Sequence, residues 1–308
     1  MALELDDDLE ALARRLARQT GESVRQAVRR SLAERLSRLS ADGGETDILA
    51  ARVPSGPAFE VRLFGHPVIF RRASNGERHE VSWRLRRSMA VLVYLALAPG
   101  HRASKDELVE SLWRGEGPDA IQRNFHPTVS DARRSLATDA RAEEGDIPTI
   151  AHRDGVYVLD PAIRWWIDVD VFRRLVHAAE EAEEPAIELR LLESAWRLVH
   201  APLVRGFDAD WVAGPRDELH RAWLAALRRI GELASQLGRH ELALDAWRRL
   251  LMEEPFEEQA HLEVMELYGR AGRRDLVRRQ YVKLQELLTE LDVEPAPKTQ
   301  ERYLDLMR

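Results

Sequence analysis

Cationic and hydroxyl side chains recur along one stretch near the middle of the chain, and their spacing predicts a shared surface. On a helical wheel drawn through residues 118–137, Arg123, Ser130 and Arg134 point to the same side. A guanidinium group can form two hydrogen bonds to guanine, and hydroxyl and imidazole groups reach either bases or phosphates. An ordinary solvated helix surface with arginines is the alternative. The predicted DNA contacts are Arg123, His126, Thr128, Ser130, Arg133 and Arg134.

The opposite side of the wheel is apolar and predicts how the segment packs. The apolar residues are Ile121, Phe125, Val129, Ala132 and Leu136. They fall within about one quarter of the circumference, as a core-facing stripe does. Pro127 lies inside this segment, where proline costs an α-helix roughly 3 kcal/mol. We therefore expect a break, with the groove-reading helix beginning near Pro127.

The segments before this helix predict strands and then helices. Residues 59–64 alternate between apolar and polar side chains, and residues 68–70 read as a second strand after a Gly-His-Pro turn. Helical periodicity follows over residues 83–97 and ends at a Pro-Gly pair. Ser104 and Glu107 form a capping box, which predicts the start of another helix.

After the third helical segment, residues 148–152 and 156–159 read as two strands joined by an Arg-Asp-Gly turn. Strands, three helices and a terminal hairpin, in that order, are typical of a winged helix-turn-helix. In that fold the third helix enters the major groove and the hairpin touches the DNA backbone. The weaker candidates for phosphate and wing contacts are Arg86, Arg87, Ser104, His152 and Arg153.

These motifs resemble a known family. Residues 124–136 (Asn-Phe-His-Pro-Thr-Val-Ser-x-x-Arg-Arg-x-Leu), preceded by Ser-x-x-x-Leu-x-x-x-Leu-Trp at 104–113, resemble the OmpR-type winged helix of the antibiotic-regulatory-protein (SARP) family of bacterial activators. Residues 153–159 look like the family's wing. Residues 168–175 (Asp-Val-Asp-x-Phe-x-x-Leu) look like the start of its bacterial transcriptional activation domain. The proline in the third helix departs from the most familiar members.

The resemblance covers roughly residues 58 to 308. It implies an OmpR-type winged helix over 58–160 and a tetratricopeptide-like activation domain over 165–308. The family's activators dimerise, bind repeated promoter sites and recruit RNA polymerase. By this resemblance, the expected partners are double-stranded DNA, RNA polymerase and a second copy of the chain.

An internal repeat supports the helical reading of the last part of the chain. Gly-Arg-x-x-Leu at 238–242, followed by Trp247, recurs as Gly-Arg-x-x-Leu at 272–276, followed by Tyr281. The shift of 34 residues is the tetratricopeptide period, and such hairpins stack into a concave surface suited to a peptide or protein. Trp247 and Tyr281 are expected in the core rather than at a ligand.

The first 40 residues carry a second resemblance, to short ribbon-helix-helix antitoxins that dimerise through a swapped strand. Its motifs are Met-Ala-Leu-Glu-Leu at 1–5 and Thr-Gly-Glu-Ser-Val-x-x-Ala-Val-Arg-Arg at 20–30. The outward ribbon positions would include Glu4 and Asp6, which repel phosphate. We therefore interpret 1–40 as a dimerisation segment and 41–57 as a linker. An amphipathic helical hairpin packed on the rest of the chain is the alternative.

Composition narrows the remaining function classes. The net charge is −7, yet residues 58–160 carry 15 basic and 15 acidic residues, so the total charge does not argue against DNA binding. The absence of cysteine excludes disulfides, thiolate metal sites and a cysteine nucleophile. No apolar run reaches the length of a membrane span, and the acidic N-terminus lacks a secretory h-region, so we expect a cytoplasmic protein with no membrane partner.

No phosphate-binding loop, paired-histidine metalloprotease motif or nucleophile elbow occurs in the sequence. We therefore expect no enzyme, no cofactor and no metal site. The predicted fold is mainly α with small β elements. The predicted function is sequence-specific regulation of transcription, and the alternative is an adaptor in which the helical hairpins bind protein and the winged helix serves protein contacts.

Overall fold

The computed structural model describes residues 58–73, 76–137 and 148–308. The chain forms two compact units, Met1–Val53 and Pro54–Arg308, and the described residues belong to the second. The predicted ribbon-helix-helix segment and the linker after it lie outside the described residues. Within them, the prediction of a mainly helical chain with small sheets is confirmed.

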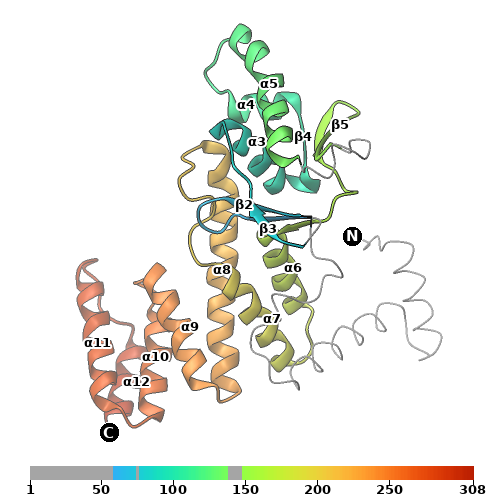
Figure 1. Cartoon of the computed structure of the whole chain (residues 1–308). Coiled ribbons are helices and arrows are strands. Elements are labelled where there is room, and N and C mark those ends of the chain that lie inside the picture. The colour runs from blue at the N-terminus through green and yellow to red at the C-terminus, as the bar shows by residue number, and fades with distance from the viewer. Residues whose placement is uncertain (1–57, 74–75, 138–147) are drawn as a thin grey trace, which may run out of the picture. The chain divides into compact units, whose positions relative to one another are not determined.

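The first sheet has four short strands and joins the two ends of the winged-helix region (Figure 1). Its strands are β1 (Phe59–Arg62), β2 (Val68–Arg72), β3 (Arg78–Glu80) and β7 (Trp165–Ile167), in the order β3-β2-β1-β7. β1 and β2 are antiparallel, as expected for a hairpin. β7 pairs in parallel with β1, about one hundred residues away in sequence, and was not predicted.

Three helices and a second sheet complete the winged helix. The helices are α3 (Arg86–Leu97), α4 (Lys105–Leu112) and α5 (Pro118–Leu136), and the short 3₁₀ helix η1 (Pro99–His101) follows α3. The second sheet holds β4 (Arg102–Ser104), β5 (Ile150–Arg153) and β6 (Val156–Leu159), in the order β4-β6-β5. The predicted hairpin is confirmed, since Asp154 and Gly155, both at positive φ, form the two-residue turn between β5 and β6.

The expected break at Pro127 is wrong, because α5 runs without interruption from Pro118 to Leu136. The pyrrolidine ring lies on the exposed side of the helix, where it displaces no packing. The hydroxyl of Thr128 donates a 2.7 Å hydrogen bond to the carbonyl of Asn124. This bond adds to the helix but does not replace the missing one, since the N–H of residue 127 would serve the carbonyl of Arg123. Burial of the apolar stripe outweighs the roughly 3 kcal/mol cost of an internal proline.

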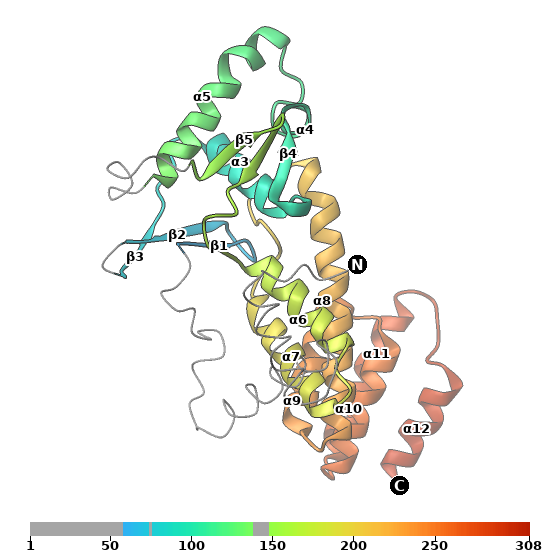
Figure 2. The ribbon, with the colours of Figure 1, turned by 90° about the vertical axis from the view of Figure 1, so that its right-hand side faces the viewer.

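The rest of the chain is helical (Figures 1 and 2). Its helices are α6 (Asp168–Glu180), α7 (Pro185–Leu198), α8 (Asp210–Gln236), α9 (His240–Glu253), α10 (Glu258–Arg270), α11 (Arg274–Thr289) and α12 (Pro297–Met307). Consecutive helices pack side by side, α6 on α7, α8 on α9 and α10 on α11. The chain leaves α8 and α10 through Gly238 and Gly272, which both adopt positive φ, so the 34-residue period corresponds to repeated helical hairpins.

Trp247 and Tyr281 occupy the core, as predicted, with 1% and 8% of their surface exposed. One continuous cluster of buried apolar side chains extends from β1 through the winged helix and into α9 and α10. The winged helix and the first helical hairpins therefore share a core.

Among the described residues, no helix is both long and apolar enough to cross a membrane.

Candidate nucleic-acid interface

The packing of α5 decides which of its side chains are free to touch DNA. Phe125, Val129, Ala132 and Leu136 are buried, as the wheel predicted, and Ile121 is partly buried. The ring of Phe125 lies 5.2 Å from that of Trp113 and 5.4 Å from that of Tyr157. Both contacts fix the rotation of α5 about its axis.

A polar contact between α3 and α5 adds to this fixation. The hydroxyl of Ser88 shares its one proton between the carboxylate of Asp131 at 2.8 Å and the carbonyl of Thr128 at 3.2 Å. Ser88 and Asp131 are both buried. Neither residue was singled out in the sequence, although a serine among the apolar residues of α3 and an aspartate beside the buried stripe of α5 are the available signals.

The opposite side of α5 is open to solvent. Arg123, His126, Ser130 and Arg134 are exposed, and they follow one another along the helix as predicted. The Arg134 side chain is 71% exposed, and its guanidinium lies 3.7 Å from the carboxylate of Asp131. Within the described part of the chain, Arg123 has no salt bridge. Two guanidinium groups, an imidazole and a hydroxyl are therefore available on a single face.

Two predicted DNA contacts on α5 are used inside the fold. Thr128 is 5% exposed, and its hydroxyl is spent on the carbonyl of Asn124. Arg133 is partly buried, and its Nε donates a 2.7 Å hydrogen bond to the carbonyl of Ile150 in β5. Arg133 therefore ties α5 to the wing. On the wheel Arg133 lies at the edge of the exposed side, whereas Thr128 lies next to Ile121 on the apolar side, so the wheel already indicated burial of Thr128.

The predicted wing residues are exposed at the hairpin. The imidazole of His152 stacks on the ring of Tyr157 with 4.6 Å between ring centres. Arg153 donates a 2.7 Å hydrogen bond to Asp160, whose side chain is fully buried. Both side chains are therefore held by neighbours while part of their surface faces solvent.

Ser104 has a structural role at the start of α4. Its hydroxyl accepts a 3.2 Å hydrogen bond from the backbone N–H of Glu107, and the Glu107 carboxylate accepts a 2.6 Å bond from the Ser104 N–H, so the predicted capping box is confirmed. The hydrogen bond from the Ser104 backbone holds the pKa of Glu107 below its usual range. The Ser104 side chain is thus engaged as a helix cap.

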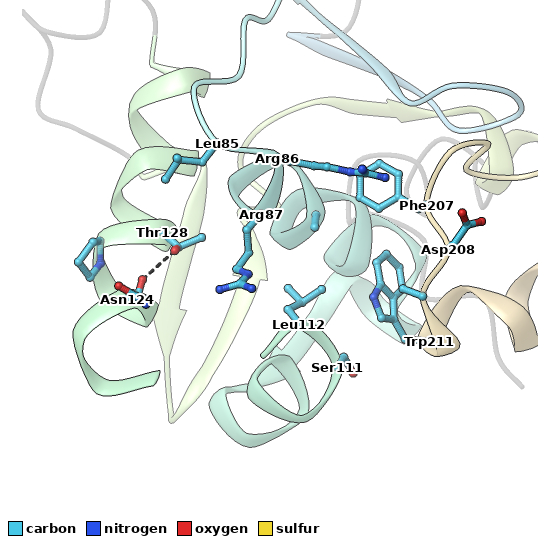
Figure 3. Close-up of a pocket in the computed structure, with 13 residues that line it drawn as sticks. Leu85, Arg86, Arg87, Ser111, Leu112, Asn124, Thr128, Phe207, Asp208 and Trp211 are labelled. Atoms are coloured by element: carbon cyan, nitrogen blue, oxygen red, sulfur yellow. Dashed lines mark hydrogen bonds between the residues drawn. The ribbon is translucent and has the colours of Figure 1, made fainter. Parts of the chain in front are cut away.

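Arg86 and Arg87 begin α3 and point in different directions (Figure 3). The Arg86 guanidinium lies 4.9 Å from the ring centre of Phe207 and donates to the carbonyl of Gly206, both in the loop before α8. Arg87 forms a 2.6 Å ion pair with Glu116 and covers the ring of Trp113. Arg86 therefore connects the winged helix to the helical region, and Arg87 stabilises the connection from α4 to α5.

The described residues contain no cluster of three or more histidine, cysteine, aspartate or glutamate side chains that could hold a metal ion. The exposed functional groups are instead the hydrogen-bond donors on one face of α5 and those of the wing. Such donors suit phosphate and base-edge recognition.

Comparisons with known proteins identify two parts of the chain. Residues 167–306 match the family model described as bacterial transcriptional activator domain. Residues 1–54 match the family model described as Rv0623-like transcription factor. No curated protein matches the chain at a significant level.

One solved structure is similar over most of the chain. It is EmbR from Mycobacterium tuberculosis in complex with a low-affinity phosphopeptide, with a TM-score of 0.61 and 19% identity. The match spans 82% of this chain and 66% of that one, so this chain covers less than two thirds of the solved structure. At this identity the likeness shows the fold.

The predicted resemblance is therefore confirmed. The chain carries a bacterial transcriptional activator domain behind a winged helix, in a fold that EmbR shares. The match at residues 1–54 fits the ribbon-helix-helix resemblance of that segment.

Proposed function

We propose that this chain is a transcription regulator that binds specific DNA sequences through α5 and activates transcription. One observation supports the proposal above all others: Arg123, His126, Ser130 and Arg134 are exposed on one face of a helix whose opposite face is buried. A helix held in this way can enter the major groove, where arginine reads guanine and serine reads several bases.

The wing supplies contacts beside the groove in this proposal. His152 and Arg153 lie on β5 at the hairpin and can reach phosphates, which position the helix without reading sequence. Thr128 and Ser104 are left out of the contact set, because the fold uses their hydroxyl groups. Arg86 and Arg87 are likewise assigned to the fold.

The proposed active form is a dimer. Residues 1–40 supply the pairing segment, since a unit of about 40 residues rarely buries an adequate core without a partner copy. Two winged helices would then bind repeated half-sites about one helical turn apart, or a multiple of it. The activator domain would contact RNA polymerase, and the protein would act in the cytoplasm, where bacterial DNA lies.

The first experiment identifies the DNA. Genomic fragments retained by the purified protein are sequenced, and the enriched site is mapped by footprinting. Affinity for a fragment that carries the site is then measured between about 50 and 200 mM salt, where loss of each phosphate contact flattens the logarithmic salt slope by about one unit.

We expect protection of repeated half-sites and a steep salt slope. Equal retention of all fragments would contradict sequence-specific binding and would favour the adaptor, in which the helical hairpins bind protein. Sedimentation of the protein with and without residues 1–54 tests the dimer. A monomer at micromolar concentration in both cases would contradict it.

A further inference from the structure

A pocket of about 750 Å³ opens between the winged helix and the loop that leads into α8 (Figure 3). One wall comes from α3, α4 and α5 and includes Arg86, Leu112 and Asn124. The other wall comes from the segment before α8 and from its first turn, and includes Phe207 and Trp211. The volume lies in the range of about 300–1,000 Å³ that small-molecule sites occupy.

The aromatic wall of this pocket is fixed in place. The Trp211 ring makes edge contacts with Tyr94, 5.3 Å between ring centres, and with Phe207, 6.4 Å between ring centres. Phe207 is buried and lies beneath the Arg86 guanidinium. Trp211 and Leu112 therefore give the pocket an apolar wall, and Phe207 supports the Arg86 side chain from beneath.

The polar groups of the pocket favour an anion. Arg86 donates to a neutral carbonyl, and no salt bridge joins it to a carboxylate within the described ranges. Its charge is therefore available at the pocket, whereas that of Arg87 is matched by Glu116. The first turn of α3 contains no acidic residue, so the positive end of the helix dipole adds to the potential. Asp208, the acidic lining residue, lies beside Phe207 and therefore on the Arg86 side of the pocket (Figure 3), so the lining carries two guanidinium groups against one carboxylate.

We propose that this pocket binds a small, flat, apolar molecule that carries one anionic group, with its body on Trp211 and Leu112 and its charge at Arg86. We further propose that occupancy changes DNA affinity, a part that rests on the proposed function. Asn124 and Pro127 line the pocket and belong to α5, the same helix that exposes Arg123 and Arg134.

The location of the pocket gives the physical reason for coupling. Its two walls belong to the winged helix and to the helical region, so a small shift of one against the other changes the shape of the pocket. A ligand shifts such an equilibrium only by its difference in affinity for the two arrangements. Coupling free energies of this kind usually correspond to about 5-fold to 150-fold changes in affinity.

The probe for the binding test is 8-anilinonaphthalene-1-sulfonate, which has a flat aromatic body and one sulfonate. Binding to the full chain is followed by energy transfer from tryptophan. Arg86→Ala removes the cation, Ser111→Trp fills the pocket from α4, and Arg84→Ala is the matched control, since Arg84 is exposed but does not line the pocket. N-phenyl-1-naphthylamine supplies the same body without the charge. Circular dichroism checks the fold of each variant.

We expect Arg86→Ala to weaken sulfonate binding by about tenfold, as loss of a hydrogen bond to a charged group does. Ser111→Trp should abolish binding, Arg84→Ala should leave it unchanged, and the neutral analogue should not distinguish wild type from Arg86→Ala. Equal binding by wild type, Arg86→Ala and Ser111→Trp would overturn the site, because the dye would then be bound elsewhere on the surface.

The coupling between ligand binding and DNA binding is tested by measuring affinity for the footprinted DNA fragment, with and without saturating dye. We expect an affinity change of at least about fivefold in wild type and none in Ser111→Trp. Unchanged affinity with dye bound to the pocket would overturn the regulatory part. Because dye binding is measured without DNA, a protein that binds dye but no DNA would contradict the proposed function and leave the ligand site standing.

Discussion

His101 Nε2 lies 3.0 Å from a carboxylate oxygen of Asp170 and joins the end of η1 to the first turn of α6. His101 has a φ of 54°, which is uncommon for a residue with a side chain. The contact therefore helps to hold a strained backbone at the junction between the winged helix and the helical region. The hydrogen bond to Asp170 raises the pKa of His101 above its usual value, and burial partly opposes it.

The raised pKa predicts a pH-dependent stability. A histidine whose pKa is higher in the folded state stabilises most fully below about pH 6.5 and loses this contribution as pH rises through the folded-state pKa. We expect His101→Gln to cost up to about 1 kcal/mol at pH 6 and less at pH 8, since both partners are about one third exposed. Urea unfolding at the two pH values measures the difference. An equal cost at both would contradict the prediction.

Asp168 is the first residue of α6, and its side chain binds the backbone that follows β1. Its buried carboxylate accepts hydrogen bonds of 2.7 and 2.9 Å from the backbone N–H groups of Leu63 and Phe64. Burial raises the pKa of Asp168 to about 6. We expect Asp168→Ala to lower the free energy of unfolding by about 2–4 kcal/mol, because two buried donors lose their acceptor. Asp168→Asn keeps one acceptor oxygen and should cost less, which thermal unfolding can rank.

Two glycines inside helices of the helical region should differ in how well they tolerate replacement by alanine. A methyl group at Gly231 would lie 2.7 Å from Nε1 of Trp247, a rigid and buried ring. A methyl group at Gly269 would meet only the end of the Leu306 side chain, which can rotate. We expect Gly231→Ala to destabilise by about 1–3 kcal/mol through overpacking. Gly269→Ala should be neutral or stabilise by up to about 1 kcal/mol through helix propensity.

Pro127 interrupts the hydrogen bonding of α5 without interrupting the helix. We expect Pro127→Ala to raise the free energy of unfolding by about 1–2 kcal/mol, because the N–H returns while some unfolded-state entropy is regained. Gln122→Ala, at another exposed position of the same helix, is the control and should change stability little. A lower stability of Pro127→Ala would contradict the prediction. It would mean that the proline ring makes stabilising contacts in the folded protein.

Arg134 offers the sharpest test of DNA reading. If its guanidinium reads a base, Arg134→Ala should lower affinity for the footprinted site by about 1–3 kcal/mol and relax specificity at one position. Arg221→Ala, an exposed arginine on α8, is the matched control and should bind as wild type does. Fluorescence anisotropy titrations measure both. Unchanged affinity of a folded Arg134→Ala variant would reject this role.

Local signals in the sequence predicted local structure well. The capping box of Ser104 and Glu107, the turn at Asp154 and Gly155, and the 34-residue period at Gly238 and Gly272 each depend on a few neighbouring residues. The buried and exposed sides of α5 followed from one helical wheel.

Long-range contacts could not be read in this way. The parallel pairing of β7 with β1 and the caps supplied by Asp168 join residues about one hundred positions apart. Arg133 lies at the edge of the exposed side of the wheel, which gives a direction and not the partner that a side chain finds. Thr128 was predicted as a DNA contact for its hydroxyl group, although the wheel places it beside Ile121 on the apolar side. At Pro127 the local rule predicted a break, and tertiary packing overrode it.

The strand β7 has a practical consequence for dissection of this protein. A fragment that stops at residue 160 would leave β1 with an unpaired edge and would remove the carboxylate that satisfies Leu63 and Phe64. Bare strand edges invite aggregation. A chimaera that exchanges the DNA-reading module of one regulator for another should therefore be joined beyond Val169, so that the transplanted sheet brings its own last strand.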